Sequence, residues 1–406
     1  MALEKSHARN QKTTALATFR IAMSLVFLLS FGASAHAVPA TQAAERGAPG
    51  QERLSSAKRL CEDLGAGCRV AKIMYWQVRS LFFAKPEQGL YWLYIISALS
   101  VAMMVYALGL PRLRDFSVTG CLHFIFPNAV YRHASAVTDY KYYITTGFVD
   151  PFLTLVIAGG TAIPVSSRVS AALNSIVGPL TLHARPGWIA RLAYTVLLVA
   201  AIDLGYFIFH YLAHRIEFLW EFHKVHHAAE VLTPITGYRN HPIDSLLQLS
   251  IIGGIVGFLN GVMTYWYQRP PDLITVLNTS VVLFAYNLTT NLRHSHVWLS
   301  YGNIASHILS SPAQHQIHHS CEVRHLDTNF GRVLSLWDWM SGTLYIPTEK
   351  EEFRLGLRHE EHREYVSLWG CYVLPFIKAF RGLTKGRPAL DSKGDKVVIP
   401  QTVKRI

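Results

Sequence analysis

The sequence predicts an all-α protein: a polytopic membrane helical bundle of about four to five spans with a histidine-rich helical cap on its cytoplasmic side. Three observations support this fold class. Half of the 406 residues are hydrophobic and only 16% are charged, against roughly 25% in soluble domains. Several apolar stretches are long enough to cross a bilayer. Eight of the twenty histidines lie in three short clusters at helical spacing.

The net charge of +12 does not indicate a nucleic-acid-binding protein. The sequence has no compact basic motif with interleaved aromatic residues, the usual footprint of such proteins. Its basic residues flank the apolar segments instead, as they do where membrane helices meet the cytoplasmic surface. We therefore expect no nucleic-acid partner.

Residues 1–37 are predicted to be a signal peptide, with an uncleaved signal anchor as the alternative. A basic region precedes an apolar run over 21–33, and residues 35–37 have the small-x-small form of a cleavage site. If the signal is cleaved, the mature chain begins outside.

Residues 38–89 are predicted to be an N-terminal extramembrane segment. It contains Cys61 and Cys68, which can pair as a local disulfide in an oxidising compartment or remain two free thiols. The other three cysteines have no metal-ligand spacing. Any metal site is therefore expected to use nitrogen ligands rather than sulfur.

An N-terminal membrane region is predicted over 90–191. Its first span, 90–110, carries no charge and ends at a Pro-Arg-Leu-Arg sequence, a basic flank that places this end inside. A second candidate span, 148–165, is weaker because it contains two prolines.

Three further apolar stretches lie in the predicted core, 192–347: 192–209, 246–266 and 273–290. The last two are joined by a turn that carries two prolines. With an outside start, five crossings place all three histidine clusters on one inner side, together with the C-terminal tail, 348–406. The spans and the clusters thus agree on one orientation.

The histidine clusters have the spacing of metal ligands. Steps of three and four residues place side chains on one face of a helix, so each cluster can aim several imidazoles at a common point. Eight imidazoles exceed the four ligands of a closed zinc site, which implies a di-metal cap. The clusters are His210 and His214; His223, His226 and His227; and His315, His318 and His319.

Ligand type does not choose the metal, because imidazole suits iron, copper, nickel and zinc alike. A redox reaction on a membrane lipid would favour iron, since zinc has no redox chemistry. Two other classes of protein stay open. A histidine-rich membrane metal transporter would place its ligands near the midplane of broken helices, and a structural metal-binding protein would need fewer ligands.

The sequence around the clusters resembles the histidine-box core of the fatty acid hydroxylase superfamily, also called the sterol desaturase family. Members are integral-membrane di-iron oxygenases. The resemblance covers 192–347, and its ordered boxes are highly specific. It rests on Asp203-Leu-Gly-Tyr206-Phe-Ile-Phe-His210-Tyr-Leu-Ala-His214, Leu219-Trp220-Glu-Phe-His223-Lys-Val-His226-His227, Arg239-Asn-His241-Pro242, Asn291-Leu-Arg-His294, Pro312-Ala-Gln-His315-Gln-Ile-His318-His319 and Asp327-Thr-Asn329-Phe-Gly331.

The resemblance implies that the eight box histidines and His294 ligate two irons. His241 and His296 would be either additional ligands or groups that support the ligands. The chain departs from the family pattern at His296, where asparagine is usual, and at Tyr211, where arginine usually follows the first histidine.

The resemblance also implies supporting residues around the ligands. Asp203, Asp327 and Asn329 are expected to hold the ring N–H groups of ligating histidines; for Asp203, a hydrogen bond between helices is the alternative. Asp338 and its neighbour Trp337 are expected to fix the fold after the third box. His325 has no box partner and is expected at the surface.

The implied reaction is O2-dependent oxidation of a C–H bond in a membrane lipid. Electrons would come from a separate donor such as a reductase, a ferredoxin or a cytochrome b5-like protein, because the chain has no Rossmann fingerprint, haem-binding pattern or iron–sulfur cysteine spacing. Hydroxylation, desaturation and ether cleavage share these boxes, so the reaction and the lipid stay open. The expected location is the bacterial inner membrane with the boxes facing the cytoplasm, or alternatively the endoplasmic reticulum.

Overall fold

The structure is a computed structural model in which part of the chain is described. The predicted signal segment, the predicted extramembrane segment with Cys61 and Cys68, and the end of the C-terminal tail lie outside the described residues. The described residues are 90–180, 186–276, 279–280, 284 and 287–385.

The described chain is helical, which confirms the predicted fold class. The only sheet in this part of the chain is one antiparallel pair, β1 (Thr275–Val276) and β2 (Thr279–Ser280). The long helices are α4 (Trp92–Gly109), α7 (Ala134–Ile157), α8 (Ile163–Ile176), α9 (Trp188–Arg215) and α11 (Pro242–Tyr267). The shorter helices are α5 (Val118–Ile125), α6 (Asn128–Tyr131), α10 (Glu217–His227), α13 (Thr290–Arg293), α14 (Gly302–Ser306), α15 (Pro312–His318), α16 (Leu336–Ser341), α17 (Leu368–Tyr372) and α18 (Leu374–Lys385). Single turns and short 3₁₀ helices are η1 (Leu113–Asp115), η3 (Pro234–Tyr238), η4 (Val323–His325) and η5 (Arg358–Tyr365).

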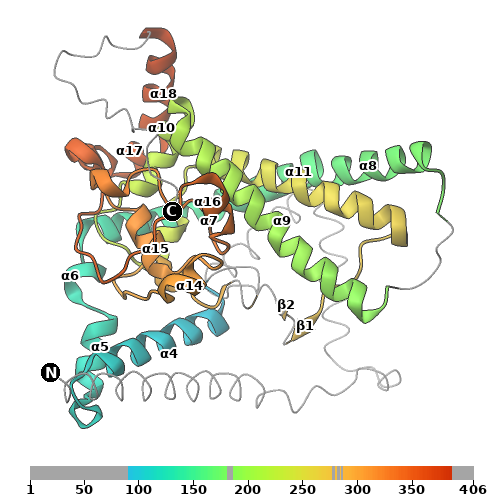
Figure 1. The fold of residues 1–406 in the computed structure, drawn as a ribbon. Helices are drawn as coiled ribbons and strands as arrows, with labels where there is room; N and C mark the ends of the chain where they lie inside the picture. The colour runs from blue at the N-terminus through green and yellow to red at the C-terminus, as the bar shows by residue number, and fades with distance from the viewer. Residues whose placement is uncertain (1–89, 181–185, 277–278, 281–283, 285–286, 386–406) are drawn as a thin grey trace, which may run out of the picture.

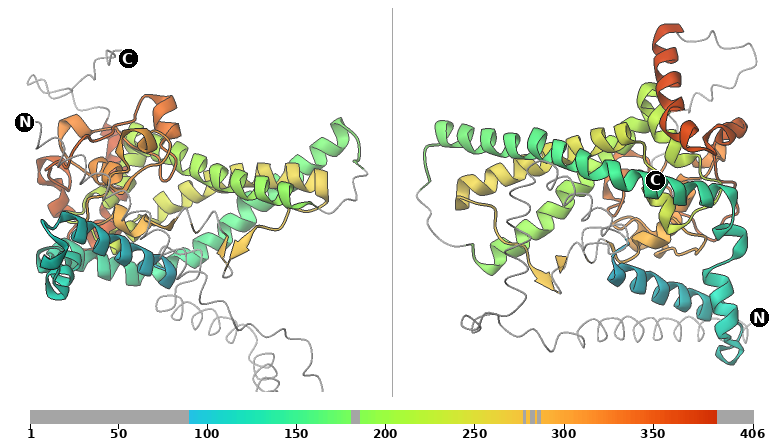
Figure 2. Two further views of the ribbon diagram at one scale, coloured as in Figure 1. Left: turned by 60° about the horizontal axis from the view of Figure 1, so that its bottom comes forward. Right: turned by 180° about the vertical axis from the view of Figure 1, so that it is seen from behind.

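Two long helices, α9 and α11, run side by side away from a cap formed by the shorter helices (Figure 1). A third rod lies along α11: α7 passes through a π-helical turn (Ala158–Ala162) directly into α8. Figure 2 shows the same rods from two other directions, projecting from one side of the cap. The chain therefore separates into an elongated helical layer and a compact cap at one end of it.

Three of the described helices, α4, α9 and α11, are long and apolar enough to cross a membrane. They correspond to the predicted spans 90–110, 192–209 and 246–266. The weaker candidate, 148–165, runs across the junction of α7 and α8. The protein is an integral membrane protein, and three is the number of spans that its described helices support.

The prediction of a helical span over 273–290 is wrong. Within that stretch Thr275 pairs with Ser280, and Val276 with Thr279, as antiparallel strands. The β-branched side chains of Thr275, Val276 and Thr279 favour extended backbone over helix. The chain nevertheless returns from the far end of α11 to the cap, because α13 packs on α4 and α15.

Helix α11 meets α8 along a Gly-x3-Gly-x3-Gly face, the small-residue pattern by which membrane helices approach closely. A Cβ atom on Gly257 would lie 2.6 Å from the carbonyl oxygen of Ala162, and one on Gly261 would lie 2.7 Å from that of Ser166. Gly254 faces open space, with nothing within 4 Å of an added Cβ. Gly257 and Gly261 are thus required for contact, and Gly254 is not.

Replacing Gly261 with alanine is expected to destabilise the protein by about 1–3 kcal/mol, because a methyl group would be forced against helix backbone. Gly254→Ala is the matched control on the same helix and should be neutral or stabilising, since alanine favours helix. Apparent melting temperatures in detergent measure both effects. Equal melting temperatures for the two variants would contradict the close packing of α8 on α11.

Candidate metal centre

The structure brings together nine histidines, all those for which metal ligation was predicted. They form two adjacent groups in the cap, and within each group one ring nitrogen of every member lies within 4.8 Å of those of all the others. All but His214 and His294, which are half-buried, are buried. The first group is His210, His214, His223, His227 and His318; the second is His226, His294, His315 and His319.

Helix geometry explains how two groups arise from three boxes. His210 and His214 are four residues apart on α9, so both rings leave the same face and enter the first group. Adjacent histidines instead point about 100° apart on a helix. The His-His pairs that end the second and third boxes are therefore split, with one ring in each group.

The two split pairs also bring the groups side by side. His227 and His318 lie in the first group with ring centroids 4.7 Å apart, and His226 and His319 lie in the second at 4.6 Å. The rings of His227 and His319 then stack across the two groups at 4.6 Å. Each group thus combines ligands from α10 and α15, and the two centres share a wall of imidazoles.

Three rings of the first group are fixed from behind by protein oxygens. The Nδ1 atom of His210 donates to the carbonyl of Phe330 at 2.8 Å, and that of His318 donates to the carbonyl of Thr328 at 2.8 Å. The Nδ1 atom of His223 donates to a carboxylate oxygen of Asp244 at 3.1 Å.

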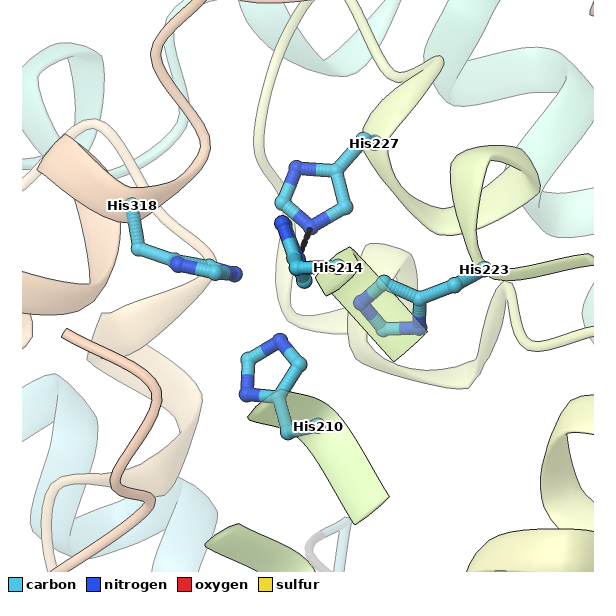
Figure 3. Close-up of side chains that lie close together, drawn as sticks. All are labelled: His210, His214, His223, His227 and His318. Atoms are coloured by element: carbon cyan, nitrogen blue, oxygen red, sulfur yellow. Dashed lines mark hydrogen bonds between the residues drawn. The ribbon is translucent and has the colours of Figure 1, made fainter. Parts of the chain in front are cut away.

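These bonds leave Nε2 of the same three histidines as a bare acceptor, buried and without a hydrogen-bond partner among the described residues. Figure 3 shows the five rings of the first group directed at a common space. Several buried lone pairs aimed at one point would be costly unless a cation lies between them.

The second group is tighter. The Nε2 atom of His294 lies 3.2, 3.0 and 3.2 Å from the Nε2 atoms of His226, His315 and His319, and the last two are 3.2 Å apart. A tetrahedral metal with bonds of about 2.0–2.1 Å to imidazole nitrogen would separate its ligands by about 3.3 Å. The four nitrogens therefore fit a metal ion at their centre.

The rings are held in the neutral form that metal binding requires. Burial, reinforced by the neighbouring histidines, keeps the pKa of His226, His227, His315 and His319 well below the ordinary value. Burial also lowers the pKa of His294 and of His318 to about 3. At neutral pH these six rings therefore present lone pairs rather than charge.

Asn329 does not hold a histidine ring, and that expectation is corrected. For Asp203 the structure shows the alternative, a hydrogen bond between helices α9 and α16. Asp203 accepts from the backbone N–H groups of Val333 and Leu334 and from the indole of Trp337, so it ties α9 to the chain after the third box. The side chain of Asn329 bonds to backbone at Gln314 and Tyr345. The backbone carbonyls of the residues on either side of it, Thr328 and Phe330, hold the histidine rings, while the Asn329 amide fixes the conformation of the loop.

Asp327 and Asp338 behave differently from each other. Asp327 lies 3.9 Å from Nδ1 of His214 and 3.4 Å from the Arg215 guanidinium, so it borders the first group. Asp338 accepts from the backbone N–H groups of Phe330 and Gly331 at 2.7 Å each. It thereby fixes the carbonyl that holds His210, a structural role that the sequence predicted in outline.

The three other histidines discussed from the sequence also lie outside both groups. His241 accepts from the Ile243 N–H through Nδ1 and donates to the Tyr372 carbonyl through Nε2, so neither nitrogen is left for a metal. His296 donates to the carbonyl of Phe124. The prediction that His325 lies at the surface is wrong: it is fully buried, with Nε2 3.1 Å from a carboxylate oxygen of Glu351.

Asp244 is the supporting residue that sequence reasoning missed. It lies in the first turn of α11, where an acidic residue is ordinary because it complements the helix dipole. Nothing in its spacing distinguishes that role from contact with His223. Only the packing of α10 against the start of α11 reveals it.

A cavity of about 260 Å³ opens beside the first group. His214, His227 and His318 line it, together with the indole of Trp220. The rest of its lining is mixed and includes Leu326 and Leu357. The polar side chains there are Ser320, Cys321, Asp327, Arg358 and Glu361. A reacting group can therefore reach the first group directly.

Comparison with known proteins finds similarity over the part of the chain that contains the nine histidines of both groups. Residues 195–343 match the family model described as fatty acid hydroxylase. The chain is 29% identical to alkylglycerol monooxygenase of Xenopus tropicalis over 39% of its own length and 31% of that protein, and 28% identical to the Danio rerio protein of the same name over 49% and 44%. It is 27% identical to ornithine lipid hydroxylase OlsE of Rhizobium tropici over 63% and 71%.

The chain spans less than half the length of the two alkylglycerol monooxygenases. No solved structure matches it significantly.

Proposed function

Residues 195–343 belong to the fatty acid hydroxylase family, and on this premise we propose that the protein is a membrane-bound di-iron oxygenase that hydroxylates a lipid. The observation that carries the proposal is the pair of adjacent histidine groups, whose nine rings provide nitrogen ligands for two metals. The relatives named for acting on alkylglycerols and ornithine lipids support a lipid as the substrate.

Two iron ions in these groups would supply O2 activation and oxidation of a C–H bond. The balanced reaction consumes the lipid R–H, O2, two electrons and two protons, and forms R–OH and water. The two electrons come from a separate donor protein, for which the sequence offers no internal substitute. His210, His214, His223, His227 and His318 would hold one ion, and His226, His294, His315 and His319 the other.

The residues of the chain would position the ions and the lipid. The carbonyls of Phe330 and Thr328 and the carboxylate of Asp244 fix three rings, so the first ion would be bound in one geometry. The cavity beside that group would admit the reacting carbon between Trp220 and the histidines. Arg358 and Glu361 in its lining are suited to a lipid headgroup.

The direct test is lipid mass spectrometry with isotopic oxygen. The purified protein in nanodiscs of host lipid is supplied with Fe(II), a ferredoxin and its reductase, and ¹⁸O2. Hydroxylation predicts a lipid that gains one oxygen atom carrying the label. Loss of two hydrogens without label would indicate desaturation instead, and an unchanged lipid extract with iron bound would contradict the proposal.

The proposed orientation places the cap in the cytoplasm. Arg269 is exposed just beyond α11, at the end away from the cap, whereas Glu352 is exposed on the cap. We expect an impermeant maleimide to label Arg269→Cys in intact cells and to label Glu352→Cys only after permeabilisation. Cys61, Cys68 and Cys321 are replaced by serine in both variants. The reverse labelling pattern would overturn the orientation.

A further inference from the structure

The cap has an apolar face where α14 and α16 adjoin. Ser335 on the chain leading into α16 donates to the carbonyl of Ile308, Leu309 pairs with Leu334, and His307 contacts the ring of Trp339. Large apolar side chains are exposed on this face. They are Ile304 (86% exposed), Ile308 (56%), Leu309 (42%), Trp339 (58%) and Met340 (73%).

Charge is missing from this face. Residues 297–311 and 333–345 contain no lysine, arginine or glutamate, and their one aspartate, Asp338, is buried. Other parts of the cap are rich in charge: η5 alone, Arg358–Tyr365, carries two arginines and three glutamates. An exposed apolar patch of this kind marks a contact surface for a membrane or for another protein.

The position of this face along the axis of α9 follows from its contacts with that helix. The Phe330 carbonyl lies opposite His210, and the Arg332 guanidinium lies over the ring of Tyr206. The backbone of Val333 and the indole of Trp337 then bond to Asp203. The chain between the third box and α16 therefore descends along α9, away from the histidines and toward the start of that helix.

The polar end of α9 away from the cap is marked by Arg191, which donates to the backbone carbonyls of Asp272 and Leu273. Asp203 lies twelve residues later, about 18 Å along the helix at 1.5 Å per residue. The hydrocarbon core of a bilayer is about 30 Å thick. A bilayer that begins at Arg191 therefore extends about 12 Å beyond the level of Asp203, which is the level of His210 in the first histidine box.

We propose that the α14–α16 face of the cap is immersed in the hydrocarbon of the bilayer, beside the span formed by α9. The occupant of this surface is lipid acyl chain. Asp203, which would otherwise be a carboxylate in hydrocarbon, is buried and accepts three hydrogen bonds from the segment that leads into α16. The cap would thus be a part of the membrane domain rather than a body standing above it.

The test places a bimane fluorophore at Met340→Cys and, as a second probe, at Ile304→Cys, in protein lacking Cys61, Cys68 and Cys321. Val323→Cys is the matched control, because Val323 is also apolar and exposed (51%) but lies between Glu322 and Arg324. The proteins are reconstituted in phosphatidylcholine nanodiscs with nitroxide groups on the acyl chains. Iodide serves as the aqueous quencher.

We expect acyl-chain nitroxide to quench both patch probes by about twofold or more over the control, and iodide to quench the control more strongly. Equal response of patch and control probes would overturn the proposal. Protection of the patch probes from both quenchers, together with disulfide cross-linking of the unlabelled Met340→Cys protein, would also overturn it, because a second copy of the chain would then cover the face. Each variant is accepted for measurement only if it retains wild-type metal content, which shows that the cap is folded.

Discussion

Replacing His226 with alanine is expected to abolish lipid oxidation and to reduce bound iron from about two ions per chain to about one or fewer. His226 is one of only four histidines in the second group, and its Nε2 lies 3.2 Å from that of His294. Its loss would leave three imidazoles at that centre. Its ring also packs on His319, so the deletion loosens a second ligand.

The metal is measured per folded protein after anaerobic purification, alongside turnover. His241→Ala is a matched buried control, since His241 lies in the same cap but uses both ring nitrogens for other hydrogen bonds. It should lose about 1–3 kcal/mol of stability, because the cap of α11 and the partner of the Tyr372 carbonyl are both removed, and it should keep its iron. His123→Ala, on the exposed surface of α5, should change neither quantity. Full activity with two irons in His226→Ala would disprove the assignment of ligands.

The box histidines could be predicted from sequence because their spacing carries the geometry. His210 and His214 are four residues apart, and a helix turns such a pair to one face whatever surrounds it. The division of the histidines into two groups was harder to predict from sequence. It depends on where α10 and α15 meet, which no local spacing specifies.

The residues that hold the histidine rings could not be predicted in the same way. Most of them act through backbone groups or through contacts that only tertiary packing creates. Two of the rings are held by carbonyl groups, which every residue carries. Asp203 and Asn329 are conspicuous in sequence, yet they shape the loop that supplies those carbonyls. The sequence identified an important segment but not which atoms of it contact the metal ligands.

Two further errors, the span over 273–290 and the position of His325, have separate physical causes. Residues 273–290 are apolar enough for a span, but Thr275 and Val276 adopt extended backbone, and hydropathy does not distinguish the two conformations. His325 was expected at the surface because it has no histidine partner in sequence. Its partner is Glu351, 26 residues away, and the pair is formed by tertiary packing alone.

Arg239 is the residue whose loss should destabilise the cap most. It is buried, its guanidinium lies 2.8 Å from a carboxylate oxygen of Asp139 on α7, and it donates to the carbonyl of Tyr365 at 2.8 Å. These bonds connect the segment before α11 to α7 and to the C-terminal helices. Gly237 in that segment packs directly beneath the ring of His294, so the same connection supports the second histidine group.

Arg239→Met is expected to cost about 3–5 kcal/mol, because Asp139 is left buried without its cation. Asp139→Asn in the same chain should recover part of that loss: the amide is neutral and can still accept from the hydroxyl of Thr236. Apparent melting temperatures of wild type, both single variants and the double variant form a cycle that isolates the coupling between the two side chains. If the double variant were as unstable as the sum of the singles, the ion pair would not be what holds this segment, and the contacts of Arg239 with Tyr365 would have to carry the stability instead.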